Sequence, residues 1–319
     1  MSLGIERKKA EKEKAMGEVE TFTQYRPLLF SIAYRMLGTV VDAEDMVQET
    51  FLRWQQTSEV TVQSAKTYLA TIITRLCINH LRSARVQREQ YIGSWLPEPL
   101  VTPWAGDPAD VAELNESLAT AFLVLLESLS PTERAVFLLH EVFDYDYPEI
   151  GQIVGKNPAN CRQILRRARQ HLEPQRPRFH VSPEQRQQLT LQFIQAWNAG
   201  DLQGLLSLLA KDVTSWSDGG GKVRAALKPL HDSRKVARFL LAIRRSRQVS
   251  TFVPNLAKIN GQPGIINYVN GCPWSVITFD IAQSRIQSLY IVVNPDKMKR
   301  VSEGLSRESP QTMPRCSLL

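Results

Sequence analysis

The chain has 319 residues, of which 43% are hydrophobic, and a formal net charge of +7. This length allows two or three globular domains with their own cores. No apolar run approaches the ~18 residues of a membrane span, so the composition excludes a membrane-spanning protein. The cysteines Cys77, Cys161, Cys272 and Cys316 are far apart, which predicts neither a metal site nor a disulfide framework and fits a reducing cytoplasm.

The surplus of positive charge is concentrated in two segments of the chain. Arginines gather between Arg75 and Arg88 and again between Arg162 and Arg178. Clustered arginines attract the phosphate groups of nucleic acids. Two basic surfaces with a nucleic-acid partner are therefore expected.

Helical patterns open the chain after residues 1–20, which are rich in lysine and glutamate and are expected to form a disordered tail. The first pattern covers residues 21–37 and ends at Gly38. The second runs from Asp42 to Trp54 and leaves one polar face, here called the acidic ridge, made of Asp42, Asp45, Gln48 and Glu49. Acids near a helix N-terminus also suit its positive end, so the ridge alone establishes no function.

A third helix, predicted over residues 64–85, changes character along its length. It is apolar up to Cys77 and then exposes cations and hydrogen-bonding groups together. Such a surface suits a phosphate backbone and unstacked bases. The alternative, cations attracted to the negative end of a helix, accounts for two of them but not for four arginines. The candidate DNA-binding residues are Arg75, Asn79, His80, Arg82 and Arg85.

Residues 91–110 are predicted to be a linker, because prolines and glycines forbid a continuous helix there. Their stiffness should be closer to polyproline than to a random coil. The segment nevertheless carries Trp95, Leu96 and Trp104. Large apolar side chains rarely remain in water, so the linker is expected to dock on another part of the protein.

A helix-turn-helix pattern follows the linker. An apolar helix from Leu114 to Leu129 precedes a helix with a Ser130 to Glu133 capping box. A short helix opened by Asp146 then leads through Gly155 to a final basic helix. Its N-terminal polar residues are suited to a major groove, although a basic surface helix is the alternative. The candidate DNA-binding residues on it are Asn160, Arg162, Gln163, Arg166 and Arg167.

This order of acidic ridge, arginine-studded helix, proline-rich linker and helix-turn-helix resembles the extracytoplasmic-function sigma factors of bacterial RNA polymerase. The resemblance implies a region 2 at residues 21–90 and a region 4 at residues 111–173. It implies that Asp45, Gln48 and Glu49 bind the clamp coiled coil of core polymerase. It also implies that the third helix binds the melted minus-ten element and that the last helix reads the double-stranded minus-thirty-five element.

The remainder of the chain predicts a separate α+β domain after a linker at residues 174–182. Helices come first, at residues 183–198 and around Leu205 and Leu208, and a further helix is expected near residues 233–244. Strands are expected near residues 251–259, 264–270, 274–279 and 285–293, and the glycines of the Asp218 to Lys222 run indicate a hairpin turn. Helices followed by a meandering sheet predict an α+β cone.

Several short motifs resemble those of sigma factors with a fused SnoaL-like domain of the nuclear-transport-factor-two-like fold. They are Trp95-Leu96-Pro97-Glu98-Pro99, Asn198-Ala199-Gly200-Asp201, Asp218-Gly219-Gly220-Gly221-Lys222 and Asn294-Pro295-Asp296-Lys297. The resemblance implies a SnoaL-like domain at residues 183–297, with a flexible tail at residues 298–319, that regulates the sigma modules by gripping the linker. The residues expected at this contact are Trp95, Leu96, Pro97, Asp218, Gly219, Gly220, Asn294, Pro295 and Asp296.

The expected protein is thus a cytoplasmic sigma factor with two all-α modules and a regulatory α+β cone. A stand-alone helix-turn-helix regulator is one alternative, but it has no need of the acidic ridge. An enzyme or ligand-binding protein with a DNA-binding appendage is the other, with Asp218, His231 and Asp232 near a pocket. We expect no enzyme, cofactor or metal, and leave a small-molecule ligand of the last domain open.

Overall fold

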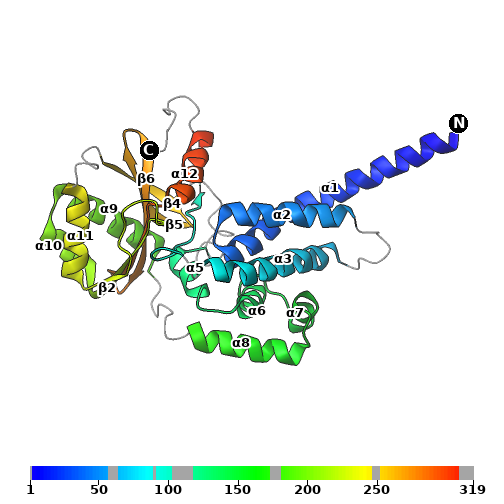
Figure 1. Cartoon of the computed structure of the whole chain (residues 1–319), viewed down its shortest axis with the longest axis horizontal. Coiled ribbons are helices and arrows are strands. Elements are labelled where there is room, and N and C mark those ends of the chain that lie inside the picture. Colours follow the sequence, from blue (N-terminus) through cyan, green and yellow to red (C-terminus); the bar gives the residue numbers. More distant parts are fainter. Residues whose placement is uncertain are drawn as a thin grey trace. The chain divides into compact units, whose positions relative to one another are not determined.

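The computed structural model describes residues 2–56, 64–88, 91–102, 118–172, 181–245 and 252–308 (Figure 1). These residues form two compact units, each made of two stretches of chain. The first unit combines Met1–Val86 with Leu126–Pro174, and the second combines Gln87–Leu125 with Gln175–Leu319. Residues 91–102 of the predicted linker therefore belong to the same unit as the C-terminal domain.

The first unit is all-α. Its N-terminal module contains α1 (Ser2–Leu37), α2 (Val40–Gln55) and α3 (Ala65–Arg88). These helices bury a shared core that includes Leu29, Ala43 and Ile73. Helix α1 begins at Ser2, so the disordered tail expected for residues 1–20 is wrong for the described part. Lysine, glutamate and alanine are strong helix formers, and charge alone does not prevent a helix.

The second helical module is built from α6 (Pro131–Glu141), α7 (Tyr147–Val154) and α8 (Pro158–Leu172). The predicted capping box of α6 is confirmed, because Ser130 and Glu133 cap each other's main chain. Asp146 and Glu149 form the same motif at α7, and Gly155 ends that helix in the left-handed conformation with a φ of 67°. A left-handed residue at this place favours glycine and aims α8 away from α7. The helix-turn-helix is therefore confirmed.

The apolar helix predicted before α6 is shorter than expected. Helix α5 covers Thr120–Leu126, whereas residues 118–119 are not helical and residues 114–117 lie outside the described part. Ala121 and Val124 of α5 pack in the second unit, where a sheet supplies their apolar partners. Tertiary contacts rather than the apolar periodicity thus set the start of this helix.

The second unit is built on a seven-stranded sheet in the order β1-β4-β5-β6-β7-β2-β3. Four strands make an antiparallel meander, β4 (Val253–Ile259), β5 (Gln262–Val269), β6 (Cys272–Ala282) and β7 (Arg285–Val292). Strand β2 (Leu209–Asp218) joins β7 in parallel, and β3 (Leu230–His231) pairs with β2. The predicted α+β class and the meander are confirmed, and with them the fold class of two all-α modules followed by an α+β cone.

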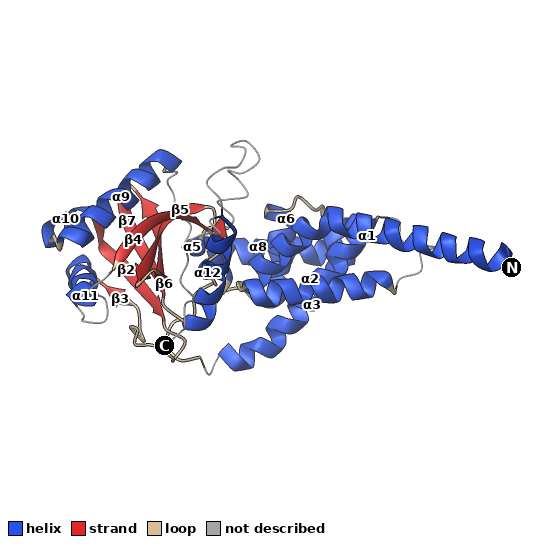
Figure 2. Cartoon of the chain, turned by 90° about the horizontal axis from the view of Figure 1, so that it is seen from above, coloured by secondary structure: helices blue, strands red, loops and turns tan. Residues whose placement is uncertain are grey.

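Helices lie on both sides of the sheet (Figure 2), and each face of the sheet has its own apolar core. The inner face, as we name it, is covered by α9 (Pro183–Ala199), α10 (Leu202–Leu208) and α11 (Ser233–Arg245). The outer face is covered by α12 (Pro295–Glu308), by α5 and by the linker residue Leu96. Helix α12 also replaces the start of the flexible tail expected from residue 298, which is wrong up to Glu308.

Two further expectations of local structure are corrected. The glycines after Asp218 do not form a tight hairpin turn, because β2 and β3 pair through Thr214 and His231 and leave a long loop between them. The linker is not irregular throughout, because Val101 and Thr102 form β1 and pair with Ile259 and Lys258 at the edge of the sheet. A two-residue strand of this kind depends on its partner strand and carries no periodic signal of its own.

The cysteines differ in state. Cys77 and Cys161 are free and buried, and burial raises the pKa of both thiols. Cys272, at the start of β6, is disulfide-bonded, a pairing that the spacing of the four cysteines does not indicate. Sequence spacing does not reveal a disulfide between segments that only the tertiary fold brings together.

Candidate polymerase, promoter and linker-binding sites

The acidic ridge lies on the solvent-facing side of α2. Asp45 and Gln48 are exposed, and Glu49 is half-buried beside Arg53, with 2.8 Å between its Oε1 and Arg53 Nε. Val41 and Leu52 are each 47% exposed and lie on the same face, four residues from Asp45 and from Gln48 respectively. A face that mixes exposed apolar and acidic side chains is typical of a protein-docking surface. Asp42 differs, because it accepts a hydrogen bond from Thr39.

The residues expected to bind the minus-ten element do not all share one environment. Arg75, Asn79 and Arg82 are exposed on one stripe of α3, at positions i, i+4 and i+7. His80 lies beside the ridge, with its Nε2 3.7 Å from Asp42 Oδ1. Arg85 is within α3, and its side chain lies outside the described part.

Arg75 already has protein partners in this structure. Its guanidinium donates hydrogen bonds to the main-chain oxygens of Ile153 and Gln152, each at 2.9 Å. Both carbonyls belong to the last turn of α7, whose negative end favours a cation. Arg75 therefore contacts the second helical module here rather than facing solvent alone.

Helix α8 presents a basic face of the kind expected. Its buried side consists of Cys161, Leu165, Ala168 and Leu172. The five candidates for the minus-thirty-five element are all exposed on the other side: Asn160, Arg162, Gln163, Arg166 and Arg167. The Arg162 guanidinium lies over the Tyr147 ring, 5.0 Å from its centre, in a cation–π contact that helps to position the side chain. Further along, Arg169 pairs with Glu141 of α6 at 2.5 Å.

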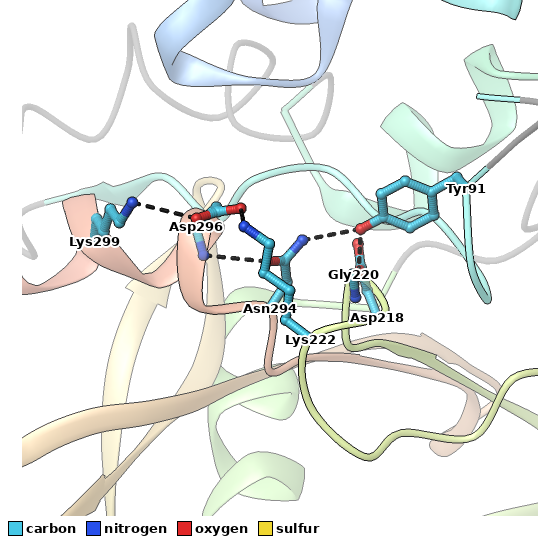
Figure 3. Close-up of polar contacts among 7 residues, drawn as sticks. All are labelled: Tyr91, Asp218, Gly220, Lys222, Asn294, Asp296 and Lys299. Atoms are coloured by element: carbon cyan, nitrogen blue, oxygen red, sulfur yellow. Dashed lines mark hydrogen bonds and ion pairs between the residues drawn. The ribbon is translucent and has the colours of Figure 1, made fainter. Parts of the chain in front are cut away.

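The linker is held by a buried carboxylate at the end of β2. Asp218 is fully buried and accepts hydrogen bonds from the Leu96 main-chain N–H at 2.9 Å and from the Tyr91 hydroxyl at 2.5 Å. Its own turn adds the Gly220 N–H at 3.0 Å (Figure 3). The Lys297 ammonium lies 2.7 Å from the same carboxylate. A buried charge is tolerated when it is paired and hydrogen-bonded in this way.

Lys297 and Asn294 complete this contact from the start of α12. The Lys297 ammonium also donates to the main-chain oxygen of Leu96. It lies over two linker rings, 4.4 Å from the centre of Trp95 and 5.4 Å from that of Tyr91. Asn294 Nδ2 donates to the Tyr91 hydroxyl at 2.9 Å. We call this set the linker clamp: Tyr91, Trp95, Leu96, Asp218, Asn294 and Lys297.

Two pKa shifts follow from the geometry of the clamp region. Burial, followed by the hydrogen bond to Asp218, raises the pKa of Tyr91. The exposed pair of Lys222 and Asp296 lies next to the clamp (Figure 3), and this hydrogen bond is the main cause of the lowered pKa of Asp296. Because its pKa is raised, the Tyr91 hydroxyl stays protonated at neutral pH and remains a hydrogen-bond donor to Asp218.

Several of the residues expected at the linker contact lie close together in this structure. Leu96 binds Asp218, Trp95 lies against Lys297, and Pro97 is buried. Asp296 is exposed and pairs with Lys222 and Lys299. Gly219 is buried, and Gly220 has a φ of 62°, with its missing side chain facing Asn294. Pro295 begins α12. The expected set omitted Tyr91 and Lys297. The sequence held a signal for each, since Tyr91 is an aromatic residue at the start of the linker and Lys297 ends the motif that begins at Asn294.

The inner face of the sheet does not gather the acids and histidine that were expected near a pocket. Asp218 is on the outer face, Asp232 caps the N-terminus of α11 by accepting from Arg234 N at 2.9 Å, and His231 is exposed. The three residues therefore form no cluster on the inner face, and their place near a pocket stays a prediction. The inner face instead carries the Oγ atoms of Ser215 and Ser217 and the Oδ1 of Asn267, which are buried and have no hydrogen-bond partner among the described residues.

Residues 21–86 match the sigma-70 region 2 family, and residues 119–172 match sigma-70 region 4. The chain is 35% identical over 291 residues to the ECF RNA polymerase sigma factor SigJ of Mycobacterium tuberculosis, covering 88% of this chain and 93% of that one. The chain belongs to the ECF sigma factors of RNA polymerase. A probable ECF sigma factor of the same organism, SigI, is 31% identical, covering 86% of this chain and 92% of its own.

A solved structure agrees with this membership of the ECF sigma factors. The crystal structure of SigJ covers 88% of this chain and 97% of its own, with 33% identity and a TM-score of 0.70. The likeness extends over both helical modules and the C-terminal domain. For this ECF sigma factor, the N-terminal module is hereafter region 2 and the module of α6 to α8 is region 4.

The described residues contain no group of three or more histidine, cysteine, aspartate or glutamate side chains placed to hold a metal ion. Within the same residues, the helices include none with the length and hydropathy of a membrane span.

Proposed function

We propose that this ECF sigma factor docks on core RNA polymerase in the cytoplasm through Asp45, Gln48 and Glu49 of the acidic ridge. The observation that supports this docking is the exposed face of α2, where these three residues lie between the exposed side chains of Val41 and Leu52. A partner surface of basic residues with apolar stems, such as a basic coiled coil, complements it in charge and shape. A stand-alone DNA-binding regulator has no use for such a face.

Run-off transcription with purified core polymerase tests the proposal. Asp45→Ala and Glu49→Ala are expected to weaken binding to core polymerase, since losing one partner of a desolvated charged pair costs ~2–5 kcal/mol. Affinity is measured by titration of labelled sigma factor. Asp212→Ala is the matched control, because Asp212 is an exposed acid of β2 outside region 2. Equal affinities for all four proteins, the unaltered chain included, exclude the ridge as the docking surface.

We further propose that α8 reads the minus-thirty-five element through Asn160, Arg162, Gln163, Arg166 and Arg167. All five are exposed on the side of the helix opposite its buried residues. Arginine can pair with guanine in the major groove, and asparagine or glutamine can pair with adenine. For region 2, the exposed Asn79 and Arg82 are the best placed of the minus-ten candidates, which also include Arg75, His80 and Arg85.

Arg162→Ala and Gln163→Ala are expected to reduce discrimination among minus-thirty-five sequences, by ~1–3 kcal/mol for a lost bidentate base contact. Binding to a panel of duplexes with single base changes, measured at several salt concentrations, provides the test. Arg169→Ala is the control, because Arg169 is engaged with Glu141 and is not among the candidate base readers. If Arg162→Ala and Arg169→Ala give the same specificity profile, the assignment of Arg162 to base reading is wrong.

We also propose that the C-terminal domain regulates transcription in cis by holding the linker. The linker contributes a strand, a buried leucine and two aromatic rings to this domain. It joins the two DNA-binding modules, so its path limits the distance between them. Binding or release of the linker by the C-terminal domain therefore changes how far region 4 can lie from region 2.

A small-molecule ligand of the C-terminal domain stays a prediction. The buried oxygens of Ser215, Ser217 and Asn267 on the inner face are the observation in its favour, because a polar ligand or water there would satisfy them. The described inner face presents no cluster of titratable groups, so the proposed role of this domain is binding and not catalysis.

A further inference from the structure

Regions 2 and 4 contact each other within the first unit through two arginines that play reciprocal roles. Arg75 of region 2 donates to the carbonyl oxygens of Ile153 and Gln152 at the C-terminus of α7. Arg134 of region 4 donates to the carbonyl oxygen of Met36 at 2.7 Å, at the C-terminus of α1. Each module thus supplies a cation that caps the negative end of a helix in the other.

The two caps differ in burial. Arg134 is 3% exposed, and its guanidinium also pairs with Glu127 of its own module at 2.7 Å. Arg75 is exposed, and its hydrogen bonds to carbonyls therefore compete with water and with any anion that reaches it. Arg134 is accordingly suited to a permanent structural contact, and Arg75 to a contact that can be exchanged.

Weaker contacts accompany the two caps along the same seam. The Lys66 ammonium lies 5.1 Å from the centre of the Tyr145 ring, and the buried Arg35 guanidinium lies 5.5 Å from that of Phe143. Thr67 Oγ1 lies 3.4 Å from Glu149 Oε1. These three are cation–π or polar contacts, each weaker than the hydrogen bonds of the two caps.

This seam is incompatible with both modules lying on their promoter elements. Arg75 to Arg85 spans about 15 Å of helix, and Ile153 to Arg167 spans about 30 Å at most, because part of it is a turn. With side chains extended, the candidate DNA-binding residues of the two regions lie no more than about 65 Å apart. The centres of a minus-ten and a minus-thirty-five element are about 25 base pairs apart, or about 85 Å at 3.4 Å per base pair.

We propose that Arg75 and Arg134 form a reciprocal latch that holds regions 2 and 4 closed in the free chain, and that Arg75 exchanges the carbonyls of α7 for promoter phosphate when the chain opens. The proposal rests on the proposed function, because opening is needed only if both modules engage one promoter. Under this proposal, the α7 carbonyls and the promoter phosphate compete for the Arg75 guanidinium.

The test is the distance between spectroscopic labels at Ser83 and Gln170, both exposed, measured first without polymerase or DNA. The unaltered chain is expected to show a short, narrow distance distribution. Arg75→Ala should raise the ratio of open to closed chains about fivefold to tenfold, as expected for losing hydrogen bonds to a charged donor near the surface. No DNA is present, so this readout reports the latch and not a lost promoter contact.

Arg82→Ala is the matched control, because Arg82 lies on the same stripe of α3 and has no region 4 partner among the described residues. It should leave the distances in the free chain unchanged. Arg134→Gln gives a second reading of the latch, with circular dichroism to show that the helices persist. Adding core polymerase and promoter DNA should lengthen the distance in every variant.

The outcomes separate the latch from the function on which it rests. If the unaltered chain initiates transcription but its label distance is the same before and after promoter binding, the latch is refuted and the sigma function stands. Equal distance distributions for the unaltered chain and Arg75→Ala also refute it. If the chain supports no promoter-specific start with core polymerase, the proposed function itself fails.

Discussion

Asp218→Ala is expected to release the linker from the C-terminal domain. The substitution leaves the Lys297 ammonium buried without its carboxylate and removes the acceptor of the Tyr91 hydroxyl and of the Leu96 N–H. Breaking a buried ion pair by removing one partner costs about 3–5 kcal/mol. Hydrogen exchange of the peptide that covers residues 91–102 measures this release, and the Leu96 amide should lose its protection.

Two comparisons distinguish loss of the clamp from general damage to the domain. Lys222→Ala breaks only the exposed pair with Asp296 and should change protection little, since surface pairs contribute about 0–1 kcal/mol. Asp218→Asn combined with Lys297→Met removes both charges and should cost less than the sum of the single changes. If Asp218→Ala and Lys222→Ala leave the linker equally protected, the carboxylate does not hold it.

The elements that could be predicted from the sequence are those with local causes. Helices α6 and α7 begin where Ser130 and Asp146 cap them, and Gly155 ends α7, because each of these residues acts on its immediate neighbours. The buried side of α8 and the four strands of the meander follow from apolar periodicity. The place of the linker contact was predictable for a different reason, a resemblance of short motifs.

The features that could not be predicted depend on partners distant in the sequence. Strand β1 exists because β4 offers an open edge to Val101 and Thr102. The burial of Asp218 likewise depends on the linker and on Lys297, which the fold brings together. Composition identified Arg75 as a cation suited to DNA, but only the packing of region 2 on region 4 gives it main-chain carbonyls as partners.

The residue that anchors the linker contact is Leu96 rather than Trp95. Trp95 has the largest side chain of its motif, yet it is half-buried, with its ring beneath the Lys297 ammonium. Leu96 is the fully buried residue, packed on the outer face of the sheet with Ile266, Val292 and Met298. Burial in a close-packed core, rather than side-chain size, determines which residue anchors a segment.

Leu96→Ala is therefore expected to weaken linker docking more than Trp95→Ala. Truncating a fully buried leucine to alanine costs about 2–5 kcal/mol, through lost apolar burial and the cavity that remains. The Leu96 main-chain groups keep their hydrogen bonds to Asp218 and Lys297 in this variant, so the change isolates the apolar part of the contact. Hydrogen exchange of the linker measures the loss directly.

The same variant tests whether linker docking controls transcription. Promoter-dependent output is compared for the intact chain, Leu96→Ala and a chain ending at Arg178, at equal occupancy of core polymerase. If the C-terminal domain acts by holding the linker, Leu96→Ala should change output severalfold and in the same direction as removal of the domain, because a few kcal/mol is enough to shift a balanced equilibrium. Val101→Thr is the control, since Val101 is a half-buried edge-strand residue whose main-chain pairing with Ile259 the substitution preserves. Equal output from the intact, Leu96→Ala and shortened chains would show that the linker contact is structural and does not regulate initiation.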